Sequence, residues 1–115
     1  MGDLSTNFSR HEFQSKDGAT LPKDYPTREL VGRLEGLRAI VGSPMTILSG
    51  HRSYDHNRAV GGATKSEHLY GRAADLEDGY ATVDQAAAAG FRGIGEKDGY
   101  ATHVDVRAIP ARWSY

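Results

Sequence analysis

Three side chains of this 115-residue chain combine the residue types and spacing that suit a divalent metal ion. His68 and Asp75 lie seven positions apart with Gly71 between them, and His103 follows near the end of the chain. Neutral imidazole and carboxylate are both good zinc ligands, and a catalytic zinc site has three protein ligands and an open position for water. By residue type alone, such a histidine and aspartate are more often a surface pair or a capped turn than metal ligands.

The surrounding residues form a longer pattern. The stretch 66–75 (SEHLYGRAAD) fills every fixed position of an SxHxxGxAxD motif, and HVDVR follows at 103–107. This pattern resembles the zinc D-alanyl-D-alanine carboxypeptidase and peptidoglycan endopeptidase family, peptidase M15, which includes phage endolysins and, more distantly, the Hedgehog signalling domain. Further segments resemble the small M15 domains of phages and bacteria in the same order: 7–18, 49–53, 56–63 and 90–95.

The resemblance implies a zinc-dependent hydrolase that cuts peptide bonds in the stem peptides of bacterial peptidoglycan, as a D,D-carboxypeptidase or an endopeptidase. It implies three zinc ligands, which are His68, Asp75 and His103. It also implies that Arg52, in the segment SGHRS, helps to bind the substrate or to stabilise the oxyanion, because a guanidinium offers forked donors to oxygen atoms. On residue type alone, Arg52 is a surface cation or a partner of Asp55.

The chain departs from better-known members of this family at the position of the general base, which must take a proton from the attacking water. Many members carry an acid three residues before the second zinc histidine, where this chain has Tyr100. Others have a histidine two residues before it, where this chain has Ala101. The base must therefore be sought elsewhere in the sequence.

Three carboxylates remain as candidates for the base: Asp105, Glu96 and Asp98. We prefer Asp105, because alternation along a strand places it on the same face as His103. The alternative for Asp105 is a supporting carboxylate or an ion pair with Arg107. A domain with a metal and no base would bind wall peptides without cleaving them, and this binding module is the alternative function.

A second alternative is a non-haem iron oxygenase, because HVD resembles the start of an HxD…H facial triad. That triad needs a later histidine, and no histidine follows Asp105. The sequence therefore disfavours this class.

Composition excludes several further classes. The chain has no cysteine, so any metal must be held by histidine and carboxylate. Its formal net charge is -1, which does not indicate a nucleic-acid partner. We see no apolar run that predicts membrane insertion or a signal peptide. We expect a monomer that stays in the cytoplasm until it is released to the cell wall, as a phage lysin is, or that forms part of a phage particle.

The sequence predicts helices and strands that position these residues within a single α+β domain spanning 1–115. Leucines recur at helical spacing through a helix expected at 28–41, with Thr27 as its N-cap and Gly42 as its end. Shorter helical segments are expected after Ser9, with Ser9 and Glu12 as a capping box, at 55–60, and at 86–89, where Thr82 and Gln85 form the capping box that opens the helix. Strands are expected at 45–48, 72–76, 91–94 and 102–106, with a hairpin turn at Asp98-Gly99.

These elements predict a small antiparallel sheet of about four strands. Helices would cover one face of the sheet and the zinc ion would lie on the other, as the resemblance to a Hedgehog/DD-peptidase-like fold implies. The last segment, 110–115, is expected to complete the fold, with Trp113 and Tyr115 covering the core.

Overall fold

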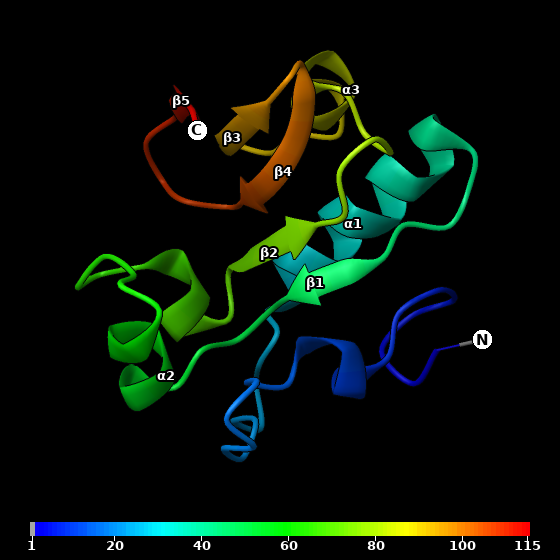
Figure 1. Cartoon of the computed structure of the whole chain (residues 1–115). Helices are drawn as coiled ribbons and strands as arrows, with labels where there is room; N and C mark the ends of the chain where they lie inside the picture. Colours follow the sequence, from blue (N-terminus) through cyan, green and yellow to red (C-terminus); the bar gives the residue numbers. More distant parts are fainter. Residues whose placement is uncertain (1) are drawn as a thin grey trace.

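The computed structural model describes residues 2–115, which form an α+β fold around one five-stranded sheet (Figure 1). The strands are β1 (Ile47–Ser49), β2 (Ala73–Leu76), β3 (Gly93–Lys97), β4 (Tyr100–Asp105) and β5 (Ala111–Ser114). The helices are α1 (Arg28–Val41), α2 (Tyr54–Ala59) and α3 (Val83–Ala88), with short 3₁₀ helices η1 (Arg10–Phe13) and η2 (Glu67–Tyr70). No helix among the described residues is both long and apolar enough to cross a membrane.

The sheet is mixed, in the order β1-β2-β4-β3-β5, which corrects the expected four-stranded antiparallel sheet. The first four strands pair antiparallel as predicted, but β5 pairs parallel with β3, from Gly93 opposite Ala111 to Glu96 opposite Ser114. After β4 the chain reverses direction and passes the end of β3, so β5 runs opposite to β4 and therefore parallel to β3. This fifth strand covers a β3 edge that would otherwise present unpaired backbone groups.

Helix α1 has the bounds that its local signals predict. The Thr27 side chain accepts a hydrogen bond from the backbone N–H of Leu30 at 3.2 Å, and Gly42 ends the helix in the left-handed conformation. Leu34 and Leu37 are fully buried, like Leu30. The predicted apolar stripe of α1 is therefore confirmed as its packing face.

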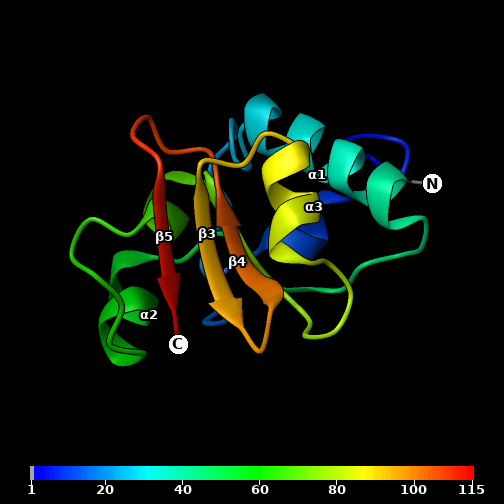
Figure 2. The same cartoon turned by 90° about the horizontal axis from the view of Figure 1, so that it is seen from above.

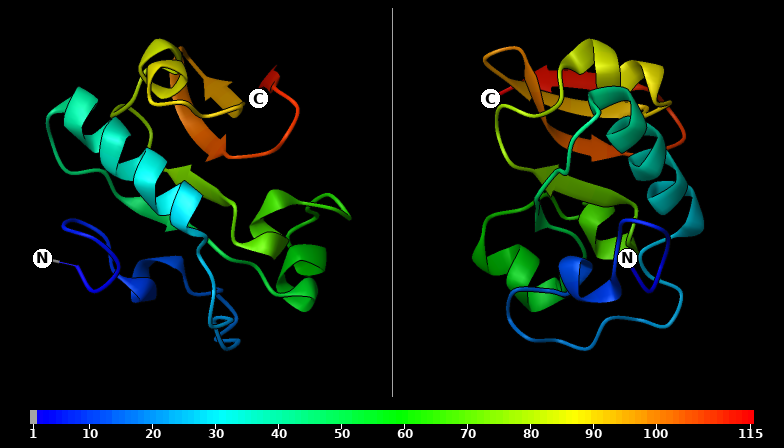
Figure 3. Two further views of the ribbon diagram at one scale, coloured as in Figure 1. Left: turned by 180° about the vertical axis from the view of Figure 1, so that it is seen from behind. Right: turned by 90° about the vertical axis from the view of Figure 1, so that its right-hand side faces the viewer.

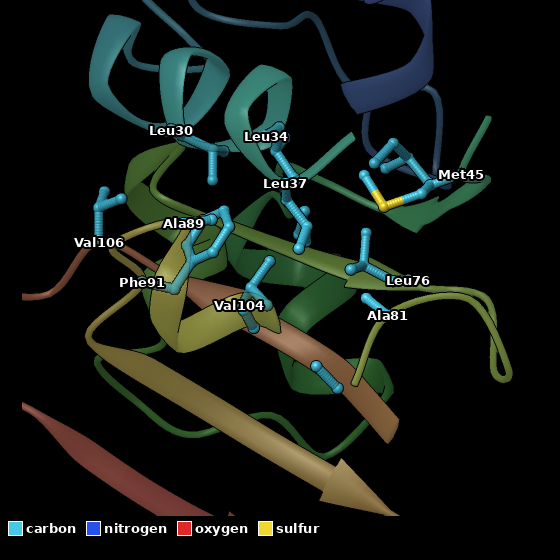
Figure 4. Packing of buried hydrophobic residues seen from close by; sticks show 14 of the residues in the cluster. Leu30, Leu34, Leu37, Met45, Leu76, Ala81, Ala89, Phe91, Val104 and Val106 are labelled. Carbon is cyan, nitrogen blue, oxygen red and sulfur yellow. The ribbon is translucent and has the colours of Figure 1, made fainter. Parts of the chain in front are cut away.

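The core lies between the sheet and the two helices α1 and α3, which cover the same face (Figure 2). In the close view, Leu34 and Leu37 of α1 point toward Val104 of β4 and Leu76 of β2 (Figure 4). Helix α3 has the predicted reciprocal capping box of Thr82 and Gln85, but it begins at Val83, before the expected range 86–89. Since strand side chains alternate, the opposite face of β2 and β4 is free for polar residues.

The N-terminal segment packs beside α1 and β1 rather than extending the sheet (Figure 3). Phe8 and Phe13 are buried in the core, and Ser9 and Glu12 form the predicted capping box around η1. Glu35 of α1 holds the start of this segment by accepting hydrogen bonds from its polar groups, which are Ser5 Oγ at 2.6 Å, Asn7 N at 2.7 Å and Asn7 Nδ2 at 2.6 Å.

Candidate metal centre

Two of the three predicted ligands lie on neighbouring strands. The antiparallel register of β2 and β4 places Asp75 directly opposite His103, and Ala73 opposite Asp105. The next residues along each strand, such as Val104, belong to the core. Asp75, His103 and Asp105 therefore share the sheet face that α1 and α3 leave uncovered.

The third predicted ligand, His68, reaches this face from η2. Ser66 begins this short helix by accepting a hydrogen bond from the backbone N–H of His68 at 3.3 Å. Gly71 ends it with a φ of 68°, where a Cβ atom would lie 2.6 Å from the Tyr25 ring. This turn needs glycine both for its backbone conformation and for space. It returns the chain into β2 and leaves His68 beside Asp75, 2 % exposed.

The three side chains converge on a small volume. One ligand atom from each of His68, Asp75 and His103 lies within 4.8 Å of the others. Asp75 Oδ1 is 3.2 Å from His68 Nε2 and 3.1 Å from His103 Nδ1. Burial alone would raise the pKa of Asp75, but its contacts with His103 and His68 outweigh burial and hold this pKa well below its usual range.

The remaining ring nitrogens have acceptors that orient both imidazoles. His68 Nδ1 lies 2.7 Å from the backbone oxygen of Gly50, and His103 Nε2 lies 2.7 Å from Asp105 Oδ2. When those outer nitrogens carry the protons, the lone pairs of His68 Nε2 and His103 Nδ1 face Asp75. Metal-binding histidines show this arrangement, in which the outer N–H donates to a carbonyl or a carboxylate. The donor set therefore fits a divalent metal.

Asp105, the predicted general base, lies behind the His103 ring as seen from Asp75 and is 0 % exposed. Arg107 pairs with it through Nη2–Oδ2 at 2.6 Å and Nε–Oδ1 at 2.8 Å. Burial would raise the pKa of Asp105, but the bonds from Arg107 and His103 hold it well below its usual range. These contacts match the alternative left open for Asp105, an ion pair with Arg107.

Arg52 lines the site from the loop after β1. Its Nη2 donates to Asp75 Oδ2 at 3.1 Å, and its Nη1 donates to Asn57 Oδ1 at 3.3 Å. Asn57 Nδ2 in turn donates to the backbone oxygen of Ala63 at 2.9 Å, which ties α2 to the loop before η2. Arg52 therefore pairs with Asp75, and the sequence alternative, a pair with Asp55, does not form.

A hollow of about 450 Å³ opens above these residues. Its lining includes all three candidate ligands and Arg52, together with Lys65, Glu67, Arg107, Trp113 and Tyr115. The last two residues were expected to cover the core, and that prediction is wrong. The centroid of the Trp113 ring lies 5.1 Å from the centroid of the His103 ring, on the uncovered face of the sheet. Tyr115 is 73 % exposed.

Gly95 explains why Trp113 reaches the site. It lies on β3 between His103 of β4 and Trp113 of β5 in the strand register. A Cβ atom on Gly95 would come within 2.7 Å of the indole nitrogen, so only glycine leaves room for the ring to lie across β3 toward His103. The alternation of Trp113 and Tyr115 is the sequence signal that could have predicted a shared strand face.

The other candidates for the base lie elsewhere. Glu96 accepts a hydrogen bond from Ser114 Oγ at 3.0 Å, and Asp98 occupies the β3–β4 turn with a φ of 55°. Neither lines the hollow above the ligands. Sequence reasoning missed Glu67, which does line it and whose Oε2 accepts a hydrogen bond from Arg72 Nη2 at 3.4 Å.

A further histidine, His51, lies beneath the site. It is buried, and its Nδ1 lies 3.2 Å from the backbone oxygen of His68. Burial lowers its pKa, so the ring is neutral near pH 7. His51 therefore braces the backbone of His68 and contributes no donor to the His68, Asp75 and His103 cluster.

A larger hollow of about 840 Å³ lies away from this cluster, between the N-terminal segment and the start of α1. Arg10, which lines it, donates to the backbone oxygens of Leu21, Lys23 and Tyr25. No group of potential metal ligands was found there among the described residues. The size of that hollow therefore does not identify it as the functional site.

Sequence comparison identifies the family of the chain. The sequence profile of the family described as Peptidase M15 matches residues 6–105. The chain belongs to the peptidase M15 family. This M15 chain is also 42% identical over 59 residues to a zinc D-Ala-D-Ala carboxypeptidase of Streptomyces albus G.

That match covers 48% of this M15 chain and 23% of the relative, so the matched part is about a quarter of the relative's length. The cofactor of the M15 chain is zinc. Its donor set, two imidazoles and one carboxylate without thiolate, is one that zinc accepts.

Proposed function

We propose that this chain is a zinc-dependent peptidase that hydrolyses peptide bonds in the stem peptides of bacterial peptidoglycan. The observation that carries the proposal is the orientation of two imidazole nitrogens toward Asp75, with each outer nitrogen held by a backbone or carboxylate oxygen. Membership of the M15 family supports the reaction, and the name of the carboxypeptidase relative supports the substrate class.

In this proposal His68 Nε2, Asp75 and His103 Nδ1 hold the zinc ion. When bound, zinc supplies Lewis-acid activation of a water molecule and of the scissile carbonyl. The backbone oxygen of Gly50 and the carboxylate of Asp105 hold the two imidazoles in the orientation in which His68 Nε2 and His103 Nδ1 face Asp75.

We propose a positioning role for Asp105 in place of the role of general base. A base must reach the attacking water within hydrogen-bond distance, directly or through one further water. Asp105 is fully buried, it does not line the hollow, and its two oxygens accept bonds from Arg107 and His103. Its carboxylate instead stabilises the ring orientation in which Nδ1 of His103 faces the metal.

The carboxylate that lines the hollow without belonging to the ligand set is Glu67, and we propose it as the base. It directly precedes His68 on η2, so its side chain is carried by the same turn as a ligand. Arg72 contacts both of its oxygens, Oε2 from Nη2 at 3.4 Å and Oε1 from Nε at 3.2 Å, and each carboxylate oxygen keeps a second lone pair that can take a proton from water.

We propose that Arg52 donates a hydrogen bond to the substrate carbonyl as negative charge develops on its oxygen. Asp75 and Asn57 hold the guanidinium in place, and its remaining N–H groups are available to the hollow. Because these donors are positioned before the substrate arrives, they need little reorganisation during the reaction.

Stem peptides lie in the cell wall, so we propose that the enzyme acts there. We also propose that it acts as a monomer. The resemblance to small phage M15 domains supports release to the wall during phage lysis, as for an endolysin.

The test is a digestion of purified peptidoglycan, with added zinc or with a chelator, and the products identified by mass spectrometry. We expect zinc-dependent release of peptide fragments or of D-Ala. Asp75→Asn is the inactive control, and Asp84→Asn, the same change at an exposed position that lines neither hollow beside the metal centre, is the matched active control. Absence of any product while one zinc ion per chain stays bound would refute hydrolysis and support a binding module.

A further inference from the structure

The candidate metal centre borders two hollows rather than one. The first is the hollow of about 450 Å³ described above, and the second, of about 420 Å³, is lined in part by other residues. Arg52, Asp75 and Tyr115 line both. A ligand of the metal, Asp75, therefore stands where the two hollows meet.

The second hollow continues along the uncovered side of the sheet. Its further lining comes from four strands or their ends: Leu48, Leu76, Asp78, Lys97 and Thr102. Leu48 of β1 is 48 % exposed although its neighbour Ile47 is buried in the core. An apolar side chain left open beside a polar site can contact a bound chain.

Each hollow has a size that suits part of a peptide, because pockets for small ligands span roughly 300–1,000 Å³. A scissile bond held at Asp75 can therefore extend into both hollows. On the proposed function, we infer that the cleft binds a peptide that continues on both sides of the cut bond. The chain is then an endopeptidase that cleaves inside a stem or a cross-bridge, and not a carboxypeptidase that releases a terminal residue.

The charges in the cleft support this inference. A carboxypeptidase must recognise the terminal carboxylate of its substrate, which calls for an available cation at one end of the cleft. The two arginines that line the hollows already pair with carboxylates, Arg52 with Asp75 at 3.1 Å and Arg107 with Asp105 at 2.6 Å. Their free N–H groups can still donate to a neutral carbonyl, but their charges are already balanced by carboxylates of the protein, so neither arginine is the available cation that a terminal carboxylate requires.

The lysines are arranged differently. Lys65 lines the first hollow and Lys97 lines the second, and both are exposed. One cation on each side does not mark a single closed end. It suits a substrate that carries carboxylates on both sides of the scissile bond, as a cross-linked stem peptide does.

The test compares three substrates under identical zinc-loaded conditions, with products read by mass spectrometry. They are cross-linked peptidoglycan, a soluble stem pentapeptide ending in D-Ala-D-Ala, and the same pentapeptide with its terminal carboxylate amidated. We expect fragments from internal cleavage, equal turnover of the free and amidated peptides, and no free D-Ala as the main product.

Release of D-Ala as the main product, lost on amidation, would overturn the inference and leave the proposed peptidase function intact. Absence of zinc-dependent products from all three substrates would overturn both. The two failures are therefore distinguishable.

Two charge reversals test the use of both hollows. Lys65→Glu and Lys97→Glu should each raise KM for cross-linked substrate by roughly threefold or more, with kcat retained. Lys16→Glu is the matched control, because Lys16 is exposed and lines neither hollow. An effect on KM from only one of the two hollows would contradict a substrate that occupies both.

Discussion

The two faces of strands β2 and β4 use the same backbone for opposite purposes. Toward α1, these strands present Ala74, Leu76 and Val104, which are buried among other apolar side chains. Toward the uncovered side they present Asp75 and His103, whose polar atoms have specific partners. The alternation of side chains along a strand produces this division within a few residues.

The two faces differ in what maintains them. Burial of apolar area is non-directional, so the helix side depends on volume and tolerates substitutions that conserve it. Hydrogen bonds are directional, so the metal side depends on which atom faces which. Substitutions on the helix side should therefore change stability, whereas substitutions on the metal side should change metal binding and activity.

The largest separation of these effects is expected from Asp75→Asn. Loss of a charged ligand should lower kcat/KM on the order of 1,000-fold, more than the 10- to 100-fold cost of losing a group that supports a ligand. The metal content of the purified protein, together with its activity, measures this effect. A folded variant that retains full zinc affinity would remove Asp75 from the ligand set.

On the helix side, Leu34→Ala should reduce the free energy of unfolding by about 2–5 kcal/mol, because it opens a cavity beneath α1. Urea unfolding measures the loss. Ile40→Ala, an exposed position on the same helix, is the control and should change stability by about 0.5 kcal/mol or less. Molecules of Leu34→Ala that remain folded should still bind one zinc ion; loss of zinc from them would show that the two faces are coupled.

A smaller effect on the metal side is expected from Asp105→Asn, which removes the carboxylate behind His103. Zinc affinity should fall by about 10- to 100-fold, measured by competition with a chromophoric chelator. Asp98→Asn in the exposed β3–β4 turn is the matched control. Unchanged zinc affinity with activity abolished would instead assign Asp105 as the general base.

The smallest effect concerns the attachment of the N-terminal segment to α1. Burial would raise the pKa of Glu35, but hydrogen bonds from Ser5 and Asn7 outweigh burial and hold this pKa below its usual range. A carboxylate with a lowered pKa in the folded state stabilises the protein above the pKa of the unfolded state, and this contribution is lost as the pH falls through the folded value.

Glu35→Gln should therefore cost about 1 kcal/mol at pH 7 and progressively less as the pH falls below 4.5. Thermal unfolding of both proteins across this range measures the difference. A difference that persists unchanged at the acidic end would mean that the charge of Glu35 does not contribute.

Local signals predicted much of this molecule because their physical cause lies within one turn of chain. Helix α1 has the predicted bounds, since Thr27 and Gly42 act on their immediate neighbours. The capping boxes at Ser9 and Thr82 were predicted for the same reason. The strand alternation placed His103 and Asp105 on one face before any strand pairing was known.

The fifth strand was not predicted, because its pairing is non-local. Residues 111–114 are too short to form a strand signal of their own, and they pair with β3 only because the chain passes over its end after β4. The wrong prediction for Trp113 has the same cause, because its position depends on the pairing of β5 with β3. An aromatic residue near the end of a chain usually contributes to the core, whereas here Gly95 opens a place for it beside His103.

By itself, the sequence determined the donor types, the absence of thiolate ligands, and the strand faces that carry Asp75 and His103. Only the tertiary structure determined which ring nitrogen of His68 and of His103 faces Asp75. It also determined that Arg107 forms an ion pair with Asp105. The physical reason is range. Backbone preference and alternation act over a few residues, whereas the orientation of a ring depends on atoms brought to it by strand register and by the loop that returns His68.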